Sequence, residues 1–161
     1  KLAVEFLDMP GCTLDDWGCG TGYARKFVQH ATYRGIDGSA SPFCEAHVDL
    51  VSYRLGVDCI LLRHVLEHNR DWPFILSNAL GSFRKRLCTV LYTPLVSCRT
   101  IELPVTPKTE LHEAGIPNLM ISREEISEIL RGLWVREQVV ESATPHGQET
   151  VLYIAREGAP L

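Results

Sequence analysis

The fold is decided by the run Leu14-Asp15-Asp16-Trp17-Gly18-Cys19-Gly20-Thr21-Gly22. A short strand, Thr13 to Trp17, leads into three closely spaced glycines, and Tyr23 to Ala31 then follows as a predicted helix. Because glycine has no Cβ, a ligand can approach the main chain of such a turn closely. The first N–H groups of the following helix have no partner within that helix. The run therefore predicts a ligand-binding turn between a strand and a helix.

The spacing of the glycines and one acidic residue together indicate that the ligand of this turn is a nucleoside. Dinucleotide-binding domains use G-x-G-x-x-G, in which the third glycine packs the helix on the strand. Here Tyr23 stands where that glycine would fall, which disfavours a nicotinamide-dependent oxidoreductase. Asp37 ends a second predicted strand, Tyr33 to Asp37, and lies 19 residues after Gly18. A carboxylate at that place can accept hydrogen bonds from both hydroxyls of a ribose.

Predicted strands and helices alternate along the rest of the chain, as in an α/β domain with a mainly parallel sheet. Further strands are expected at His47 to Leu50, Val57 to Leu62, Leu87 to Tyr92, Trp134 to Val140 and Thr150 to Ala155, the last two as an antiparallel pair. A helix is expected after Asp71, with an apolar stripe of Trp72, Leu76, Ala79, Leu80 and Phe83. Its last turn is expected to carry Arg84, Lys85 and Arg86, near the negative end of the helix dipole.

Two features are expected between and after these elements. The irregular segment Leu95 to Ile121 is long enough to be a functional lid or a mobile loop. Ser122 and Glu125 form a capping box that opens a further helix, which Gly132 ends.

Composition sets limits on the class of protein. The 161 residues carry a formal net charge of −4 and are 45% hydrophobic, which suits a single domain, residues 1–161, that needs no disulfide or metal to fold. The acidity argues against a nucleic-acid partner. No apolar run is long enough for a membrane span, and no secretory signal opens the chain. The six cysteines lack C-x-x-C spacing, so we expect reduced, mostly buried thiols in a cytoplasmic protein.

With these motifs in place, the sequence resembles the class I S-adenosylmethionine-dependent methyltransferases from about Leu14 to Ala155. The run Asp16 to Gly22 looks like that family's first motif, and Asp37 matches the acid of its second. Val48-Asp49-Leu50 looks like the third motif. Asp58 to His68 resembles the fourth strand and the V-L-E-H phrase after it.

The resemblance implies a Rossmann-like fold, a cofactor and the residues that bind it. The sheet would be seven-stranded, in the order 3-2-1-4-5-7-6, with strand seven antiparallel and helices on both faces. The cofactor would be S-adenosylmethionine. In the family the third-motif Asp meets the adenine amino group, and the next backbone N–H meets a ring nitrogen. The implied cofactor-binding residues are Asp16, Gly18, Cys19, Gly20, Gly22, Asp37, Gly38, Asp49, Leu50 and Arg63.

The sequence departs from the family in two places. Asp15 stands where the first strand usually has an apolar residue, which would leave a carboxylate near the sheet edge. Only about a dozen residues precede that strand, so the N-terminal helices that close over the cofactor are expected to be missing. Their absence would mean an open site, a cover supplied by a partner, or a truncated chain.

Methyl transfer itself needs little beyond orientation of the reactants, which alone can lower a barrier by about 7–11 kcal/mol. An oxygen or nitrogen acceptor can also need a base, and His64, His68 and His112 are the candidates because imidazole titrates near neutral pH. A metal site of His64, Glu67, His68 and His112 is the alternative. It is disfavoured because the related phrase in metal-dependent methyltransferases begins with Glu, and we expect no metal.

The leading functional hypothesis is methyl transfer to an oxygen or nitrogen of a small molecule or a sugar. Methylation of RNA or protein is a second hypothesis, motivated by Arg84-Lys85-Arg86 and opposed by the overall acidity. A cofactor-binding module without catalysis is a third, motivated by the missing cover and by the lack of an unambiguous base. No motif in the sequence specifies the acceptor or an oligomeric state.

Overall fold

A seven-stranded sheet forms the centre of the molecule in the computed structural model, which describes residues 1–104 and 115–156. The strand order is β3-β2-β1-β4-β5-β9-β8. With β9 and β8 as the seventh and sixth strands of the family, this is the predicted order. The strands are β1 (Thr13–Trp17), β2 (Thr32–Asp37), β3 (Ala46–His47), β4 (Val57–Arg63), β5 (Phe83–Leu91), β8 (Trp134–Glu141) and β9 (Gln148–Ala155).

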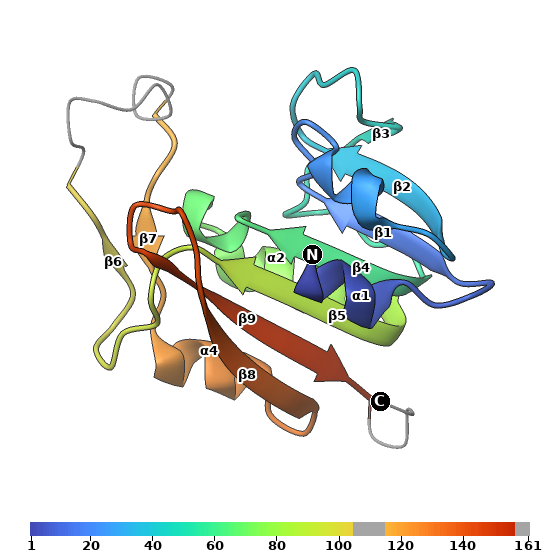
Figure 1. Ribbon diagram of the computed structural model, residues 1–161. Coiled ribbons are helices and arrows are strands. Elements are labelled where there is room, and N and C mark those ends of the chain that lie inside the picture. Colours follow the sequence, from blue (N-terminus) through green and yellow to red (C-terminus); the bar gives the residue numbers. More distant parts are fainter. Residues whose placement is uncertain (105–114, 157–161) are drawn as a thin grey trace.

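The direction of the strands places their polar ends together. β3, β2, β1, β4 and β5 pair in parallel, whereas β9 is antiparallel to both β5 and β8, as predicted. In Figure 1 the arrows of β4 and β5 therefore point one way and the arrow of β9 points the other. Ligands of open α/β sheets bind beside the carboxyl ends of parallel strands, and the start of β9 lies at the same edge.

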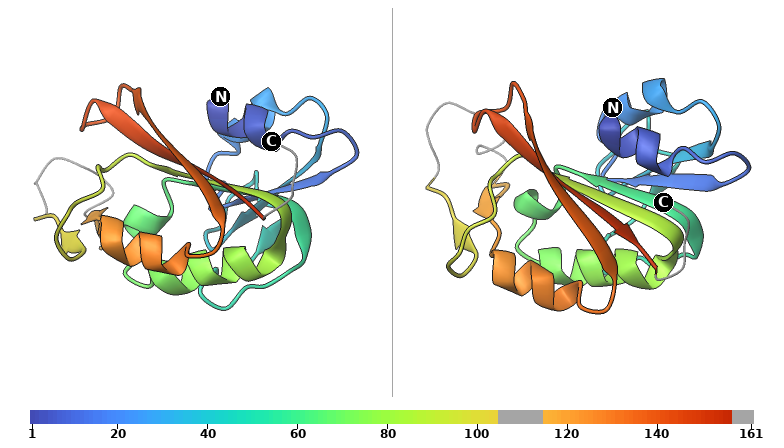
Figure 2. Two further views of the ribbon diagram at one scale, coloured as in Figure 1. Left: turned by 90° about the horizontal axis from the view of Figure 1, so that it is seen from below. Right: turned by 60° about the horizontal axis from the view of Figure 1, so that its bottom comes forward.

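Helices cover both faces of the sheet. Helices α2 (Trp72–Ser82) and α4 (Arg123–Ile129) lie on one face, where the larger apolar cluster gathers around Trp17, Ile60 and Leu76. Helix α1 (Leu2–Leu7) and the 3-10 turn η1 (Tyr23–Phe27) lie on the other face. Figure 2 shows α1 on the opposite side of the sheet from α2 and α4. β4 is buried by both layers, which explains its continuous apolar run.

The helix expected over Tyr23 to Ala31 is shorter than predicted, because η1 ends at Phe27. The carboxylate of Asp8 accepts the N–H groups of Gln29, His30 and Ala31 at 2.7–2.9 Å. These donors are therefore bound to the chain just after α1, and a helix cannot continue through them. The strand expected at His47 to Leu50 was misplaced as well, because β3 covers Ala46–His47 and shares only His47 with it.

The prediction for Arg84, Lys85 and Arg86 was wrong. α2 ends at Ser82, and the three residues belong to β5, which pairs with β4 along this stretch. The Lys85 ammonium lies 3.5 Å from the Asp58 carboxylate, and Arg86 donates to the Phe6 carbonyl at 2.7 Å. Lys85 and Arg86 are therefore engaged by partners from other elements rather than by a helix dipole.

The segment Leu95 to Ile121, expected as a lid or loop, contains a small structure of its own in its described part. Strands β6 (Ile101–Glu102) and β7 (Leu119–Met120) pair antiparallel. At its end the Ser122 hydroxyl caps α4 by accepting the Glu125 N–H, as predicted. The Glu125 carboxylate, however, accepts from the Thr100 hydroxyl at 2.7 Å. Only half of the expected capping box is therefore formed.

At the amino end, the expectation of missing helices needs a correction, because α1 precedes β1. It packs on β5, β4 and β9, and its residues do not line the cavities at the glycine turn described below.

Asp15 is buried rather than left at an edge, and Arg34 on β2 pairs with both of its carboxylate oxygens. Four of the six cysteine thiols are buried, and the cysteines form no disulfide.

Within the described ranges, no helix has the length and hydropathy that crossing a lipid bilayer would require.

Candidate functional site

The glycine turn is held open by backbone conformations that favour glycine. Gly18, Gly20 and Gly22 have φ angles of 76°, 50° and 65°. A Cβ on Gly18 would lie 2.4 Å from Cγ2 of Val65, whereas a Cβ on Gly20 would meet nothing within 4 Å. Gly18 therefore allows the turn to pack against the chain after β4, and Gly20 leaves main chain facing open space.

Asp37 connects this turn to the end of β2. One carboxylate oxygen accepts the Gly20 N–H at 2.8 Å, and the other accepts both the N–H and the hydroxyl of Ser39. Burial raises the pKa of Asp37, but the hydrogen bonds from Ser39 and Gly20 outweigh burial and bring the pKa below its ordinary value. The carboxylate is therefore ionised at neutral pH and bonded to small donors that a ribose hydroxyl can replace.

A cavity of about 430 Å³ extends from Asp37 to His64 along the carboxyl edge. Gly18 and Gly20 form part of its wall, and the structure brings the predicted residues Gly38, Asp49 and Leu50 into the same cavity. Its other lining residues are Ser39, Val48, Val51, Val65, His68, Asn69, Ile75 and Ile116. An apolar wall with a few carboxylates suits a purine and its ribose.

A second cavity of about 220 Å³ lies on the other side of the same glycines. It brings together the predicted residues Asp16, Cys19 and Arg63. Of the predicted cofactor-binding residues, Gly22 lines neither cavity and joins the turn to η1. Burial raises the pKa of Asp16 to about 6, against the lowering effect of a hydrogen bond from the Tyr33 hydroxyl at 2.7 Å. Burial also raises the pKa of the Cys19 thiol to about 12. The Cys19 thiol is therefore protonated at neutral pH.

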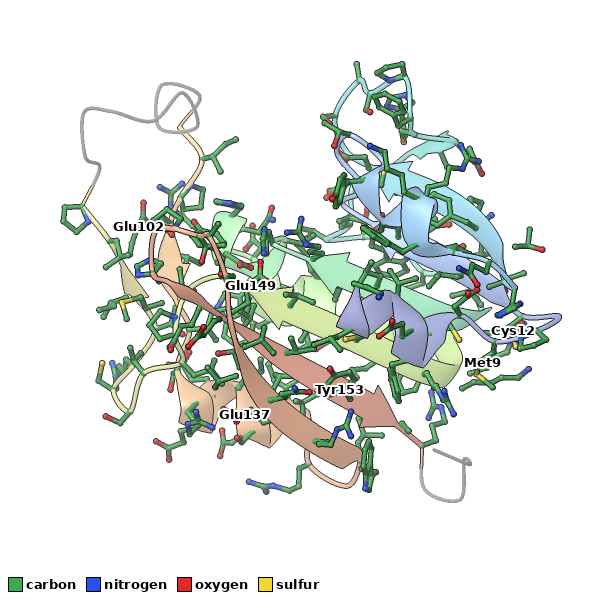
Figure 3. All side chains as sticks on the ribbon, in the orientation of Figure 1. Met9, Cys12, Glu102, Glu137, Glu149 and Tyr153 are labelled. Atoms are coloured by element: carbon green, nitrogen blue, oxygen red, sulfur yellow. The ribbon has the colours of Figure 1, made fainter. Side chains whose placement is uncertain are left out.

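His64 stands where β4 ends and is held by a residue that the sequence did not reveal. Its φ of 56° is the one positive value among the non-glycine residues of the described ranges, and such backbone strain often accompanies functional sites. Its Nε2 lies 2.9 Å from Oε1 of Glu149, which also lies 3.5 Å from the Arg63 guanidinium. Figure 3 shows Glu149 at the start of β9.

The charge of Glu149 is set by this contact. The hydrogen bond from His64 lowers the pKa of Glu149, with Arg63 acting in the same direction and burial opposing them. The ring of Tyr92, at the end of β5, lies edge-on to His64 with centroids 5.3 Å apart. Three strand ends therefore fix the imidazole. The predicted antiparallel hairpin placed the start of β9 at this edge, and that was the one signal that pointed toward Glu149.

The other candidate bases are placed differently. Nδ1 of His68 lies 3.0 Å from the Pro117 carbonyl, and His112 falls outside the described residues. Glu67 is fully buried and accepts the Tyr92 N–H at 2.8 Å, and burial raises its pKa to about 7. Since His64, Glu67 and His68 turn to separate partners, they form no joint metal site, and the described residues contain no other group of three such side chains suited to a metal ion.

Comparison with known proteins gives a fold but no closer relative. No protein-family model and no curated protein matches the sequence. Among solved structures, the Burkholderia thailandensis 1,6-didemethyltoxoflavin-N1-methyltransferase has a TM-score of 0.73 and 14% identity, over 97% of this chain and 77% of that one. Magnesium protoporphyrin IX methyltransferase from Synechocystis has a TM-score of 0.64 and 17% identity, over 92% and 75%. An S-adenosylmethionine-dependent methyltransferase from Mesorhizobium loti has 0.64 and 15%, over 92% and 93%. The chain thus has the fold of these methyltransferases.

Proposed function

We propose that the protein is an S-adenosylmethionine-dependent methyltransferase that acts on an oxygen or nitrogen of a small molecule or a sugar. The observation that carries the proposal is the pair of cavities that meet at Gly18 and Gly20, with the Asp37 carboxylate beside them. The solved neighbours support it, since the toxoflavin and protoporphyrin enzymes were both crystallised with S-adenosylhomocysteine.

The residues present fit this cofactor along its whole length. The ionised Asp37 would accept the ribose hydroxyls, and the wall at Asp49 and Leu50 would receive the adenine. The turn at Gly18 to Gly22 and the Arg63 guanidinium would hold the amino-acid end, whose carboxylate Arg63 can pair with. When bound, the cofactor supplies a methyl group on a sulfonium, which is already electrophilic. The protein then has to bind the acceptor in line and exclude water.

An acceptor that carries an O–H or N–H must also lose a proton, and His64 with Glu149 is suited to take it. Because Glu149 engages Nε2, the proton would be accepted on Nδ1. The carboxylate fixes the tautomer and stabilises the cation that forms, as in other histidine–carboxylate pairs. In this proposal His64 is the base and Glu149 is the positioning residue.

Calorimetric titration with S-adenosylhomocysteine tests the cofactor assignment. We expect binding to the wild-type protein and, for Asp37→Ala, an affinity lower by about ten- to a hundredfold, because charge-assisted hydrogen bonds to two hydroxyls are lost. Asp71→Ala is the matched control, since this carboxylate lies before α2 and makes no side-chain cap bond there. Failure of the wild type to bind, or equal affinity of Asp37→Ala, would contradict the proposal.

A further inference from the structure

A third cavity, which we call the α1-face groove, opens on the opposite face of the sheet from α2 and α4. It has a volume of about 270 Å³. Its floor is apolar and includes Leu61, Val90 and Val151 from three neighbouring strands, and Tyr23 and Phe27 of η1 form an aromatic wall. Their rings lie 5.4 Å apart in an edge-on arrangement. A groove with this lining suits a small ring system.

The groove is continuous with the proposed methyl-transfer site. Tyr23, Ala24 and Arg63 line both the groove and the second cavity, where the amino-acid end of the cofactor would lie. Glu149 also lines the groove, while its partner His64 lines the cavity of about 430 Å³ that extends to Asp37. A molecule in the groove would therefore have one end beside the residues that surround the reacting atoms.

The charge at the mouth of the groove selects among ring compounds. Two carboxylates, Glu141 and Glu149, lie there on paired strands, where Val140 is the partner of Glu149 in the β8–β9 register. Two cations, Lys1 and Arg63, line the groove as well. The Lys1 ammonium lies 3.6 Å from Glu5, and Glu149 is shared by Arg63 and His64, so Glu141 is the one charged side chain of the lining without an ion-pair partner among the described residues. An unpaired carboxylate at the end of an apolar groove complements a cation.

We propose that the α1-face groove binds the methyl acceptor, and that this acceptor is an aromatic or other small cyclic compound carrying an amine. The assignment rests on the proposed methyltransferase function, and it adds the substrate class. The ring packs on the floor between β4, β5 and β9, and the amine lies at the end where Glu141, Glu149 and Arg63 gather, so that it is itself the group beside the reacting atoms.

The test uses two probes that share a ring and differ in charge, tyramine and 4-hydroxyphenylacetate, with methyl-labelled valine and leucine followed by NMR. We expect tyramine to shift the methyl signals of Val90, Val140 and Val151 and to bind about fivefold more tightly than the anion, the size of one exposed charge interaction. Glu141→Gln should remove most of that difference. Glu124→Gln, an exposed glutamate of α4, is the matched control and should leave it unchanged.

A second pair of variants separates the groove from the cofactor site. Val140→Phe fills the groove and should abolish the tyramine shifts, whereas Val139→Phe, on the outer face of the same strand, should preserve them. Both should bind S-adenosylhomocysteine like the wild type. If the wild type does not bind S-adenosylhomocysteine, the proposed methyltransferase function is refuted. Binding of tyramine to the groove can still be measured in that case. The groove assignment is overturned if tyramine shifts none of these methyl groups, if both probes bind equally, or if the shifts follow protein concentration alone, which would indicate a second copy of the chain.

Discussion

The three glycines of the turn differ in what they do, although the sequence presents them as one motif. Gly18 combines a φ of 76° with the close approach of Val65, whereas Gly20 has a φ of 50° and open space. Gly18→Ala should therefore lower the free energy of unfolding by about 2–4 kcal/mol, from backbone strain and overpacking together. Gly20→Ala should cost about 1 kcal/mol, from backbone strain alone. Urea denaturation of both variants checks this, and equal losses would mean that Val65 moves aside freely.

Glu67 makes the stability depend on pH in a window that can be stated. Its pKa rises from 4.5 to about 7 on folding because it is buried, so the folded protein holds a proton that the unfolded chain releases. The stability of the wild type should thus fall as pH rises from about 4.5 to 7. Glu67→Gln stays neutral and keeps an acceptor for the Tyr92 N–H, so its stability advantage should grow by roughly 1–3 kcal/mol across this window.

Urea melts at several pH values measure the difference between the Glu67→Gln variant and the wild type. Asp16 titrates in the same range in both proteins, so its contribution cancels in the comparison. A difference that stays constant from pH 4.5 to 7 would show that Glu67 does not retain its proton in the folded state.

Between β1 and β2, a charged pair takes the place of an apolar contact. Asp15 is 1% exposed, and the Arg34 guanidinium bonds both of its oxygens at 2.6–3.0 Å. Arg34→Leu should lower the free energy of unfolding by about 3 kcal/mol, because it leaves a buried carboxylate without its partner. The double variant Asp15→Leu with Arg34→Leu should recover most of that loss. Thermal unfolding of the wild type, Arg34→Leu and the double variant measures these differences. If the double variant is even less stable than Arg34→Leu, the two side chains do not act as a pair.

The elements that could be predicted are those whose signal is local. The apolar run Val57 to Leu62 and the turn between β8 and β9 both carry their cause in adjacent residues. The end of η1 does not, because the Asp8 carboxylate that stops it lies 21–23 residues before the N–H groups that it binds. The basic triplet was misplaced for the same reason: its partners Asp58 and Phe6 come from other elements.

The residues of the candidate site fall into the same two groups, those with a local signal in the sequence and those without one. Gly18, Gly20 and Asp37 were predicted from the spacing of the glycine turn and the second strand, and Asp49 from the resemblance of Val48-Asp49-Leu50 to a family motif. The structure brings all four to the wall of one cavity, because parallel pairing places the strand ends at one edge. Glu149 reaches that edge through β9, 85 residues after His64. No spacing rule predicts a contact that depends on how the antiparallel hairpin is positioned beside β5. The α1-face groove likewise exists only after α1, η1 and the sheet have assembled.

Hydrogen exchange can test whether the carboxyl edge acts as one binding surface. On addition of S-adenosylhomocysteine, amides in residues 18–22, 37–51 and 63–69 should exchange more slowly, since these stretches contain most of the residues that line the two cavities meeting at Gly18 and Gly20. The outer strand β8 and helix α4 lie outside both cavities and should be unchanged. Protection confined to residues 18–22 would assign only the amino-acid end. Protection concentrated at α1 and β8 would place the ligand in the α1-face groove instead, and the proposed division between cofactor and acceptor would fail.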